Sequence, residues 1–278
     1  MARMPSRGQN AELTVCQVHG CQADGSSADA RTAPALQPSG VQPTQPDPDC
    51  PRCPRLAAWR AERRITEPDW HNGPVPAFGS LSARLLVVGL APGLRGANRT
   101  GRPFTGDYAG DLLYPTLIDH GFIDGRFDRR ADDGLVALDC RITNAVRCVP
   151  PENKPTPAEA NNCRPFLVDE MAAMPRLQVI LALGRIAHDA VLRTLGLRLA
   201  AHPFAHGAMH SVMPATMPAS SRDRVVPHSE RAAPSPARPL LVADSFHCSR
   251  YNVNTGRLTA RMFDQVVGTI RARLAAPA

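Results

Sequence analysis

The chain has 278 residues, a formal net charge of +7 and one lysine, Lys154, so nearly all of its positive charge is arginine. It contains no apolar run of about 18 residues and no apolar signal core at its N-terminus, so we expect a cytoplasmic protein without a membrane span. In that compartment its cysteines are more typical of metal ligands or free thiols than of disulfides. A Schiff-base mechanism would have to use Lys154 or the N-terminal amine.

Two segments have the composition of unfolded chain. Residues 1–48 are rich in Pro, Ser, Gln, Ala and Gly without hydrophobic periodicity, so we expect a disordered arm. Residues 49–278 are ample for one domain with a sizeable core. Within them, residues 201–239 are dense in Pro, Ala, His and Ser. We expect a long loop there, with a low-complexity insertion near residues 211–238 and any order confined to residues 202–210.

Four short apolar runs are typical of buried strands. They span residues 85–88, 138–143, 179–183 and 240–243. Helical patterns follow them, over residues 111–119, 156–174, 185–195 and 259–274. The second of these begins with a capping box, Thr156-Pro157-Ala158-Glu159, with proline at the first helical position. This alternation predicts an α/β fold, a three-layer αβα sandwich around a mainly parallel four-stranded sheet, in a single domain.

The loop after the first run is the most distinctive segment. Residues 89–107 read GLAPGLRGANRTGRPFTGD, with five glycines and two prolines. The loop has neither the Gly-x-Gly-x-x-Gly fingerprint of dinucleotide-binding proteins nor the Gly-Lys-Ser/Thr ending of a Walker motif. It is therefore not one of the common phosphate-binding loops. Phe104 stands between Pro103 and Thr105-Gly106, which would hold its ring in a fixed place. A fixed aromatic ring suits a flat ligand such as a base.

Ligands of parallel sheets bind beyond the carboxyl ends of the strands. The segments at this edge include residues 89–93 after the first run, residues 144–148 after the second and residues 245–252 after the fourth. We expect all three to converge on one crevice.

Four cysteines have the arrangement of a metal site. Cys50 and Cys53 form a CxxC pair, and Cys148 and Cys163 stand 15 residues apart around a proline-rich turn. One close pair plus two separate thiolates can bind tetrahedral zinc or a cubane iron–sulfur cluster, and four unconnected buried cysteines are the alternative.

These motifs together resemble the uracil-DNA glycosylase superfamily, and within it the iron–sulfur family 5, or type B. The resemblance covers about residues 48–275 apart from the insertion. It is carried by GLAPG at 89–93, GANRTGRPFTG at 96–106, NAVRC at 144–148, HCSRYN at 247–252, NTGRLT at 254–259 and the four cysteines. It implies a hydrolase that cuts the N-glycosidic bond of uracil in DNA, with hypoxanthine and other deaminated bases as further candidates, and leaves an abasic site. The absence of any lysine near the motifs predicts a monofunctional enzyme.

The resemblance also implies roles for individual residues. It implies a [4Fe–4S] cluster on Cys50, Cys53, Cys148 and Cys163. Phe104 would stack on the flipped base, Asn144 would hydrogen-bond its edge, and His247 would face the carbonyl next to the leaving nitrogen. Ala91 and Gly93 would form part of the floor of the substrate pocket.

The first motif departs from better-known uracil glycosylases, which carry an acidic residue or asparagine there to position water. Leu90-Ala91 stands at that place, as it does in family 5. We therefore expect bond breaking to depend on departure of the leaving group, with His247 and Asn144 stabilising the charge on the base. Asn98, Asp107 or backbone groups would hold the water, with Asn98 slightly preferred, and Asp107 fits a helix cap equally well.

Arg250 and Tyr251 follow His247 on a loop that could enter the minor groove, as a wedge or through phosphate contacts. Asn252 is expected to fix this loop or to help position the substrate. The implied partner is DNA that contains deaminated bases, with abasic-site repair enzymes acting downstream. The protein is expected to be a monomer associated with the nucleoid.

Two alternatives stand beside this interpretation. A protein of the same fold, stabilised by a bound metal, could bind damaged DNA without catalysis. A family 4-type enzyme would be strict for uracil, but it would carry an acidic residue in place of Leu90.

Three histidines in the predicted long loop of residues 201–239, His202, His206 and His210, are spaced by four. On a helix this spacing would align them as metal ligands, but His202-Pro203 argues against a helix. We expect a loop that flanks the DNA channel.

Overall fold

Five strands form the central sheet of the computed structural model, in the order β4-β1-β5-β7-β6. The structure describes residues 42–213 and 239–276, so most of the predicted arm and of the predicted insertion lies outside the described residues. The strands are β1 (Leu85–Gly89), β4 (Cys140–Asn144), β5 (Val179–Leu183), β6 (Met209–Val212) and β7 (Leu240–Ser245). Four of them are parallel and coincide with the predicted runs to within two residues.

The prediction of four strands was wrong, because β6 adds a fifth strand, antiparallel to β7. It lies in the segment that we expected to be a loop. Backbone pairing with β7 defines it, from Met209 opposite Ala243 to Val212 opposite Leu240. Only Val212 of the strand is fully buried, so an edge strand of this kind has no apolar alternation for a sequence pattern to detect.

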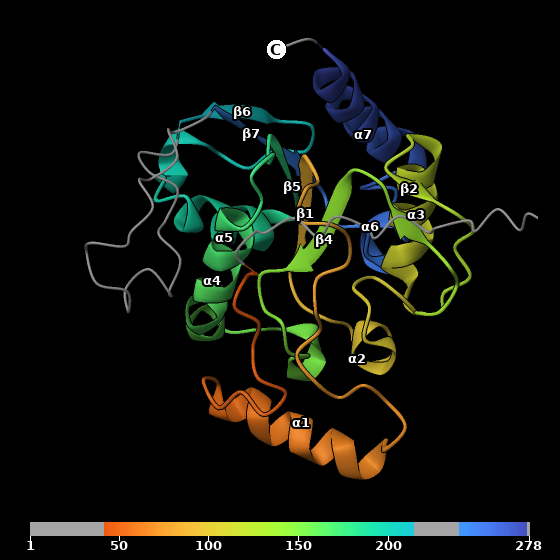
Figure 1. Cartoon of the computed structure of the whole chain (residues 1–278), viewed down its shortest axis with the longest axis vertical. Coiled ribbons are helices and arrows are strands. Elements are labelled where there is room, and N and C mark those ends of the chain that lie inside the picture. The colour runs from red at the N-terminus through yellow and green to blue at the C-terminus, as the bar shows by residue number, and fades with distance from the viewer. Residues whose placement is uncertain (1–41, 214–238, 277–278) are drawn as a thin grey trace, which may run out of the picture. The chain divides into compact units, whose positions relative to one another are not determined.

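Two helices cover each face of the sheet, which confirms the predicted three layers (Figure 1). They are α3 (Tyr108–Asp119) and α7 (Ala260–Ala275) on one face, and α4 (Pro157–Ala172) and α5 (Arg185–Thr194) on the other. Side chains alternate along β1, so that Leu85 and Val87 join the core under α3 and α7. Leu86 and Val88 join the core under α4 and α5. Among the described residues, no helix is long and apolar enough to cross a membrane.

Side-chain caps set where two of these helices begin. Asp107 accepts a hydrogen bond from the Ala109 amide at 3.1 Å, so α3 begins at Tyr108, three residues before the predicted start. The predicted capping box of α4 is present, because Thr156 Oγ1 accepts from the Glu159 amide and Glu159 accepts from the Thr156 amide.

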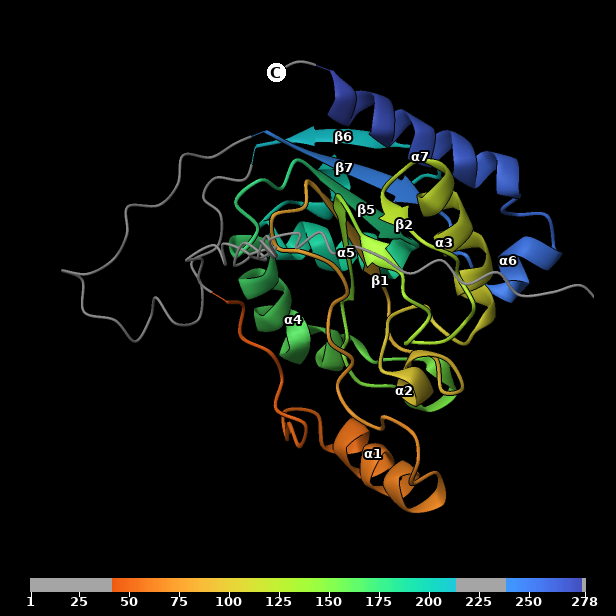
Figure 2. The same ribbon diagram turned by 45° about the vertical axis from the view of Figure 1, so that its right-hand side comes forward.

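The remaining elements surround this sandwich. They are α1 (Pro54–Thr66), α2 (Ala97–Thr100), β2 (Ile123–Asp124), β3 (Val136–Ala137), α6 (Arg250–Asn254) and 3-10 turns at Pro151–Asn153 and Leu199–Ala201. Figure 1 and Figure 2 show α1 and α2 on the side of the molecule toward which the arrow of β4, labelled in Figure 1, points. The elements beyond this edge of the sheet therefore build the functional part of the molecule.

A buried group of charges joins α4 to the strand edge. Glu170 is fully buried and accepts hydrogen bonds from Arg147 at 2.7 Å and from Arg141. Burial alone would raise the pKa of Glu170, but the guanidinium groups of Arg147 and Arg141 hold it below its ordinary value. Glu170 is therefore a carboxylate that compensates two arginines.

We predict that Glu170→Leu lowers the free energy of unfolding by about 3–5 kcal/mol, because it leaves buried arginine charge without a partner. Urea denaturation of the DNA-free protein measures the loss. The matched control is Glu62→Leu, since Glu62 pairs with Arg63 at the surface and is 55% exposed. The control should change stability by less than about 1 kcal/mol. Equal effects of the two substitutions would contradict the role given to Glu170.

Candidate active site

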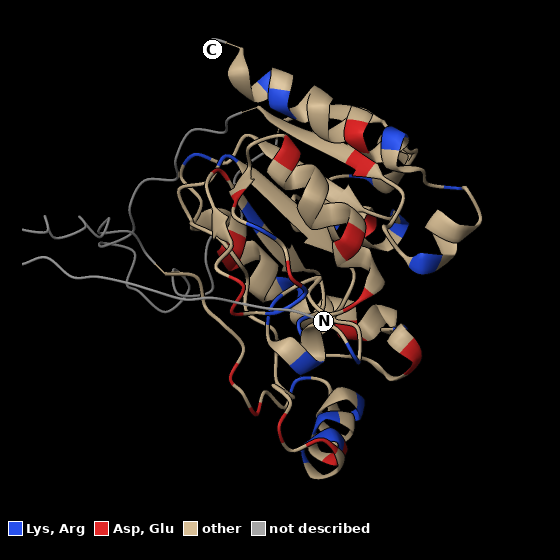
Figure 3. Cartoon of the chain, turned by 90° about the vertical axis from the view of Figure 1, so that its right-hand side faces the viewer, with Lys and Arg blue, Asp and Glu red and all other residues tan. Residues whose placement is uncertain are grey.

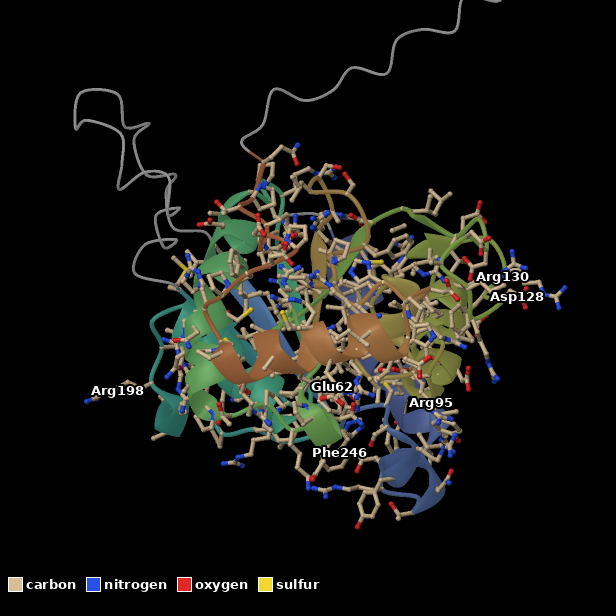
Figure 4. All side chains as sticks on the ribbon, turned by 90° about the horizontal axis from the view of Figure 1, so that it is seen from below. Glu62, Arg95, Asp128, Arg130, Arg198 and Phe246 are labelled. Atoms are coloured by element: carbon tan, nitrogen blue, oxygen red, sulfur yellow. The ribbon has the colours of Figure 1, made fainter. Side chains whose placement is uncertain are left out.

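A cavity of about 620 Å³ opens at the carboxyl edge of the sheet. Its lining includes residues of the loop after β1, Asn144 at the end of β4, and His247, Ser249 and Arg250 after β7. The predicted convergence of these segments is confirmed. Arg95, labelled in Figure 4, also lines the cavity.

A close approach of two side chains forms the inner wall of this cavity. A Cβ atom on Gly89 would lie 2.4 Å from both Asn144 Oδ1 and Phe104 Cζ, so only glycine leaves room for them. Phe104 has a left-handed backbone with φ of 54°, and a Cβ on Gly110 would lie 2.0 Å from its carbonyl oxygen. The ring of Phe104 is buried, and its centroid lies 6.0 Å from that of His247. Two glycines thus bring an aromatic ring, an amide and an imidazole together.

His247 is neutral in this environment. Burial lowers its pKa to about 4, so at neutral pH one ring nitrogen carries a proton and the other does not. The backbone carbonyl of His247 accepts a hydrogen bond from Asn252 Nδ2 at 2.8 Å. Asn252 does not line the cavity, so in this structure it fixes the loop.

Asp107 faces the cavity as well as capping α3. Its Oδ1 accepts from the Ala109 amide, while a Cβ on Gly93 or Gly96 would lie 2.7 or 2.3 Å from Oδ2. The two glycines therefore make room for the second carboxylate oxygen. Burial raises the pKa of Asp107, and hydrogen bonds from the amides of Ala109 and Gly110 partly offset the increase.

Asn98, the preferred candidate for holding water, lies outside the cavity. Its side chain is buried, and its Nδ2 donates to Asn72 Oδ1 at 2.9 Å. The Asn72 amide also donates to the Asn98 carbonyl, so the pair ties α2 to the segment after α1. The preference for Asn98 rested on its distance along the chain from Gly93, which does not determine where a side chain on a short helix points.

The rim of the cavity contains residues that sequence reasoning missed. Asn153 lines it with a left-handed backbone, φ 57°, and Tyr108 lines it and donates to Asn254 Oδ1 at 3.3 Å. The guanidinium of Arg250 lies 5.4 Å from the centre of the Tyr108 ring, whereas Tyr251 is 70% exposed. The position of Tyr108 directly after Asp107 in the glycine-rich motif was a signal that could have identified it.

The four predicted cysteines line a second, small cavity. It lies among α1, the turn after β4 and α4, and the lining includes Cys50, Cys53, Cys148 and Cys163. Three donors reach sulfur, namely the Arg147 amide to Cys163 at 3.3 Å, Arg60 to Cys148 at 3.6 Å and Asn162 to Cys53 at 3.9 Å. Such donors are suited to sulfur atoms that carry negative charge.

The sulfur atoms are not arranged as the ligands of one bound zinc ion. A tetrahedral zinc ion, with bonds of about 2.3 Å, would bring its ligand sulfurs within about 3.8 Å of one another. No three of these sulfur atoms lie within 4.8 Å of one another. Arg147, which also lines this cavity, has a buried Nη1 without a hydrogen-bond partner in the described part of the chain. An anionic group among the cysteines would provide such a partner.

Comparison with known proteins agrees with this architecture. The model of the "Uracil DNA glycosylase superfamily" matches residues 76–271. A "Type-5 uracil-DNA glycosylase" of Thermus thermophilus is 43% identical over 224 residues, 78% of this chain and 90% of the relative. One of Pyrobaculum aerophilum is 37% identical over 79% of this chain and 86% of the relative. A "Type-4 uracil-DNA glycosylase" of Archaeoglobus fulgidus is 37% identical over only 44% of this chain and 54% of the relative. The chain belongs to the uracil-DNA glycosylase superfamily, and within it to the type-5 family.

Proposed function

We propose that this chain is a DNA repair glycosylase that hydrolyses the N-glycosidic bond of uracil in DNA and leaves an abasic site. The observation that carries the proposal is that one cavity is lined by Phe104, Asn144, His247 and Asp107 together. The relatives are named as type-5 uracil-DNA glycosylases, which points to the same reaction.

The cavity has the components that a flipped base requires. The buried ring of Phe104 provides a face for stacking, and base flipping places the extruded base against such a surface. The Asn144 amide carries both a donor and an acceptor, which match the alternating carbonyl and N–H groups on the edge of uracil. Since Gly89 brings the amide next to the ring, stacking and edge recognition can act on one base.

Bond cleavage leaves negative charge on the departing base. Neutral His247 donates an N–H to the carbonyl next to the leaving nitrogen and stabilises that charge as it develops. Because burial keeps the pKa of His247 near 4, this donor is an imidazole and not an imidazolium at neutral pH. The sugar becomes cationic in the same step, and a carboxylate nearby favours it.

Asp107 is the group that holds the water. Leu90-Ala91 offers no side-chain acceptor, and Asn98 is engaged with Asn72 outside the cavity. Asp107 Oδ2 faces the space that Gly93 and Gly96 leave open. The carboxylate accepts a hydrogen bond from water and directs its lone pair to the anomeric carbon after the base departs.

Basic residues around the cavity suit the DNA backbone. Arg95 and Arg250 line the cavity, and Tyr251 next to Arg250 is exposed. Figure 3 shows further arginines on α1. Arginine pairs with phosphate through its planar fork, so Arg95 and Arg250 bind the strand while Tyr251 fills the space left by the flipped nucleotide. The partner is DNA that contains uracil or another deaminated base.

We infer that Cys50, Cys53, Cys148 and Cys163 hold a [4Fe–4S] cluster. The four cysteines line one small cavity together with Arg147, whose buried Nη1 has no hydrogen-bond partner in the described part of the chain, and both observations support an anionic group at this site. When bound, the group supplies a cross-link between α1, the turn after β4 and α4.

We predict that the purified protein releases uracil from an oligonucleotide with one uracil, and that the strand breaks only after alkali treatment. The measurement is base release together with gel analysis of the strand before and after alkali. A matched oligonucleotide with hypoxanthine tests the wider substrate range. Tight binding of uracil-containing or abasic DNA without any base release would support the non-catalytic alternative instead.

We predict that Asp107→Asn lowers the single-turnover rate of uracil release by about 100-fold or more, with little change in DNA binding, because the amide is neutral and cannot take up the proton of the attacking water. Asn98→Ala is the matched comparison and should keep the rate within about tenfold while lowering stability by about 1–3 kcal/mol, since it breaks a buried amide pair. A larger rate loss in Asn98→Ala than in Asp107→Asn would reverse the assignment.

The same assignment fixes the direction of a pH effect. Protonation removes the negative charge of Asp107 and with it the ability to take up the proton of the water, so the rate should fall as pH decreases through its raised pKa. The Asp107→Asn enzyme should lack this fall.

We predict about four iron atoms per chain and an absorption band near about 400 nm in the anaerobically purified protein. Cys163→Ala should lose both, while Cys140→Ala, a buried cysteine outside the small cavity, should keep both. Iron analysis and the visible spectrum measure the outcome. One zinc ion per chain without iron would exclude the cluster.

A further inference from the structure

The three histidines spaced by four lie next to the strand that leads to His247. Their segment pairs with β7 through Asp244, whose carbonyl accepts from the Gly207 amide at 2.8 Å and whose amide donates to the Ala208 carbonyl at 2.9 Å. Asp244 stands three residues before His247. The segment therefore contacts β7 at the point where the chain enters the active site.

His206 contacts the residue directly before His247. Its Nδ1 accepts from the Phe246 amide at 3.2 Å, and its ring stacks on the Phe246 ring with centroids 5.0 Å apart. Figure 4 labels Phe246. An accepting Nδ1 requires the neutral tautomer with the proton on Nε2. Burial lowers the pKa of His206, with a smaller opposite effect from the Met262 backbone, and so favours this neutral form.

A buried hydrogen-bonded group holds the two ends of the segment. His188 of α5 is fully buried, with Nε2 2.8 Å from the His202 carbonyl and Nδ1 2.7 Å from Asp244 Oδ1. Both partners are acceptors when Asp244 is ionised, so both nitrogens of His188 carry protons and the imidazolium balances the charge of buried Asp244. His210 Nε2 lies 3.2 Å from Asp244 Oδ2. The carboxylate is thus held through both oxygens.

The side chains of His188, His210 and Asp244 are close enough to consider a metal ion, because their ligand atoms all lie within 4.8 Å of one another. Ligands at about 2.0–2.1 Å from a tetrahedral zinc ion would be about 3.3 Å apart. The contact of 2.7 Å between His188 and Asp244 is instead the length of a charge-assisted hydrogen bond. The distances favour a hydrogen-bonded group.

We propose that His206 is a positioning residue for His247, and that the group of His188, Asp244 and His210 holds the segment of His206 against β7. The backbone around His247 is then fixed on both sides, by His206 at the Phe246 amide and by Asn252 at the His247 carbonyl. A donor aimed at a developing charge requires such a fixed backbone. The inference rests on the proposed role of His247 in departure of the base.

The test compares two substitutions of His206. His206→Phe keeps a ring to stack on Phe246 but removes the acceptor, while His206→Asn keeps an acceptor near the position of Nδ1. We expect His206→Phe to lower the single-turnover rate of uracil release about 10- to 100-fold with KM within about threefold of the parent. His206→Asn should recover most of that rate. His202→Ala is the matched control, since it keeps the carbonyl that His188 binds, and should remain within about twofold.

Two further measurements separate positioning from general stability. Amide hydrogen exchange at Phe246 should become faster in His206→Phe and return toward the parent value in His206→Asn, and this readout does not depend on activity. Parent-like rates and parent-like Phe246 exchange in His206→Phe would overturn the proposal. A parent enzyme that releases no base would contradict the proposed function, while the exchange result would still test the contact. One zinc ion per parent chain, lost in His188→Gln, would replace the hydrogen-bonded group with a metal site.

Discussion

The missing side chain at Gly89 is the constraint on which the active-site cavity depends. Gly89 and Asn144 are paired in the parallel register of β1 and β4, so the end of one strand places the amide beside the end of the other. The ring of Phe104 then occupies the space where a Cβ would be. In the function proposed for this cavity, recognition of a base edge and stacking on its face would thereby be combined by backbone geometry. A side chain at Gly89 would displace both groups at once.

Burial disfavours the charged form of each ionisable group in this molecule. The charges around each group decide whether the charged form persists. His247 has no compensating charge beside it and stays neutral, so one ring nitrogen carries a proton that it can donate in a hydrogen bond. The buried carboxyl of Asp107 has a raised pKa and only backbone amides to oppose the shift. Glu170, which is fully buried, remains a carboxylate because Arg147 and Arg141 surround it. Burial thus shifts the pKa of His247 and Asp107 toward their neutral forms, while the two guanidinium groups keep Glu170 ionised.

The sequence predicts the parts of this structure that leave a local pattern. The parallel strands appear as apolar runs, the start of α4 as a capping box, and the convergence of three segments follows from the direction of parallel strands. β6 leaves no such pattern, because its partner on β7 and the contact of His210 with Asp244 define it. The direction of Asn98 is equally nonlocal, since Asn72, 26 residues away, determines it. Contacts between distant segments are what a single sequence does not display.

The active-site cavity and the small cavity lined by the four cysteines share one short stretch of chain. Cys148 follows Asn144 by four residues, and the turn that continues from it brings Asn153 to the rim of the active-site cavity. Arg55, two residues after Cys53, donates to the carbonyl of Lys154 at 3.1 Å and so holds the far end of the same turn. A group bound by the four cysteines would fix both ends of this turn through α1. Its contribution to base recognition would then be geometric, since it would hold one wall of the cavity without contacting the base.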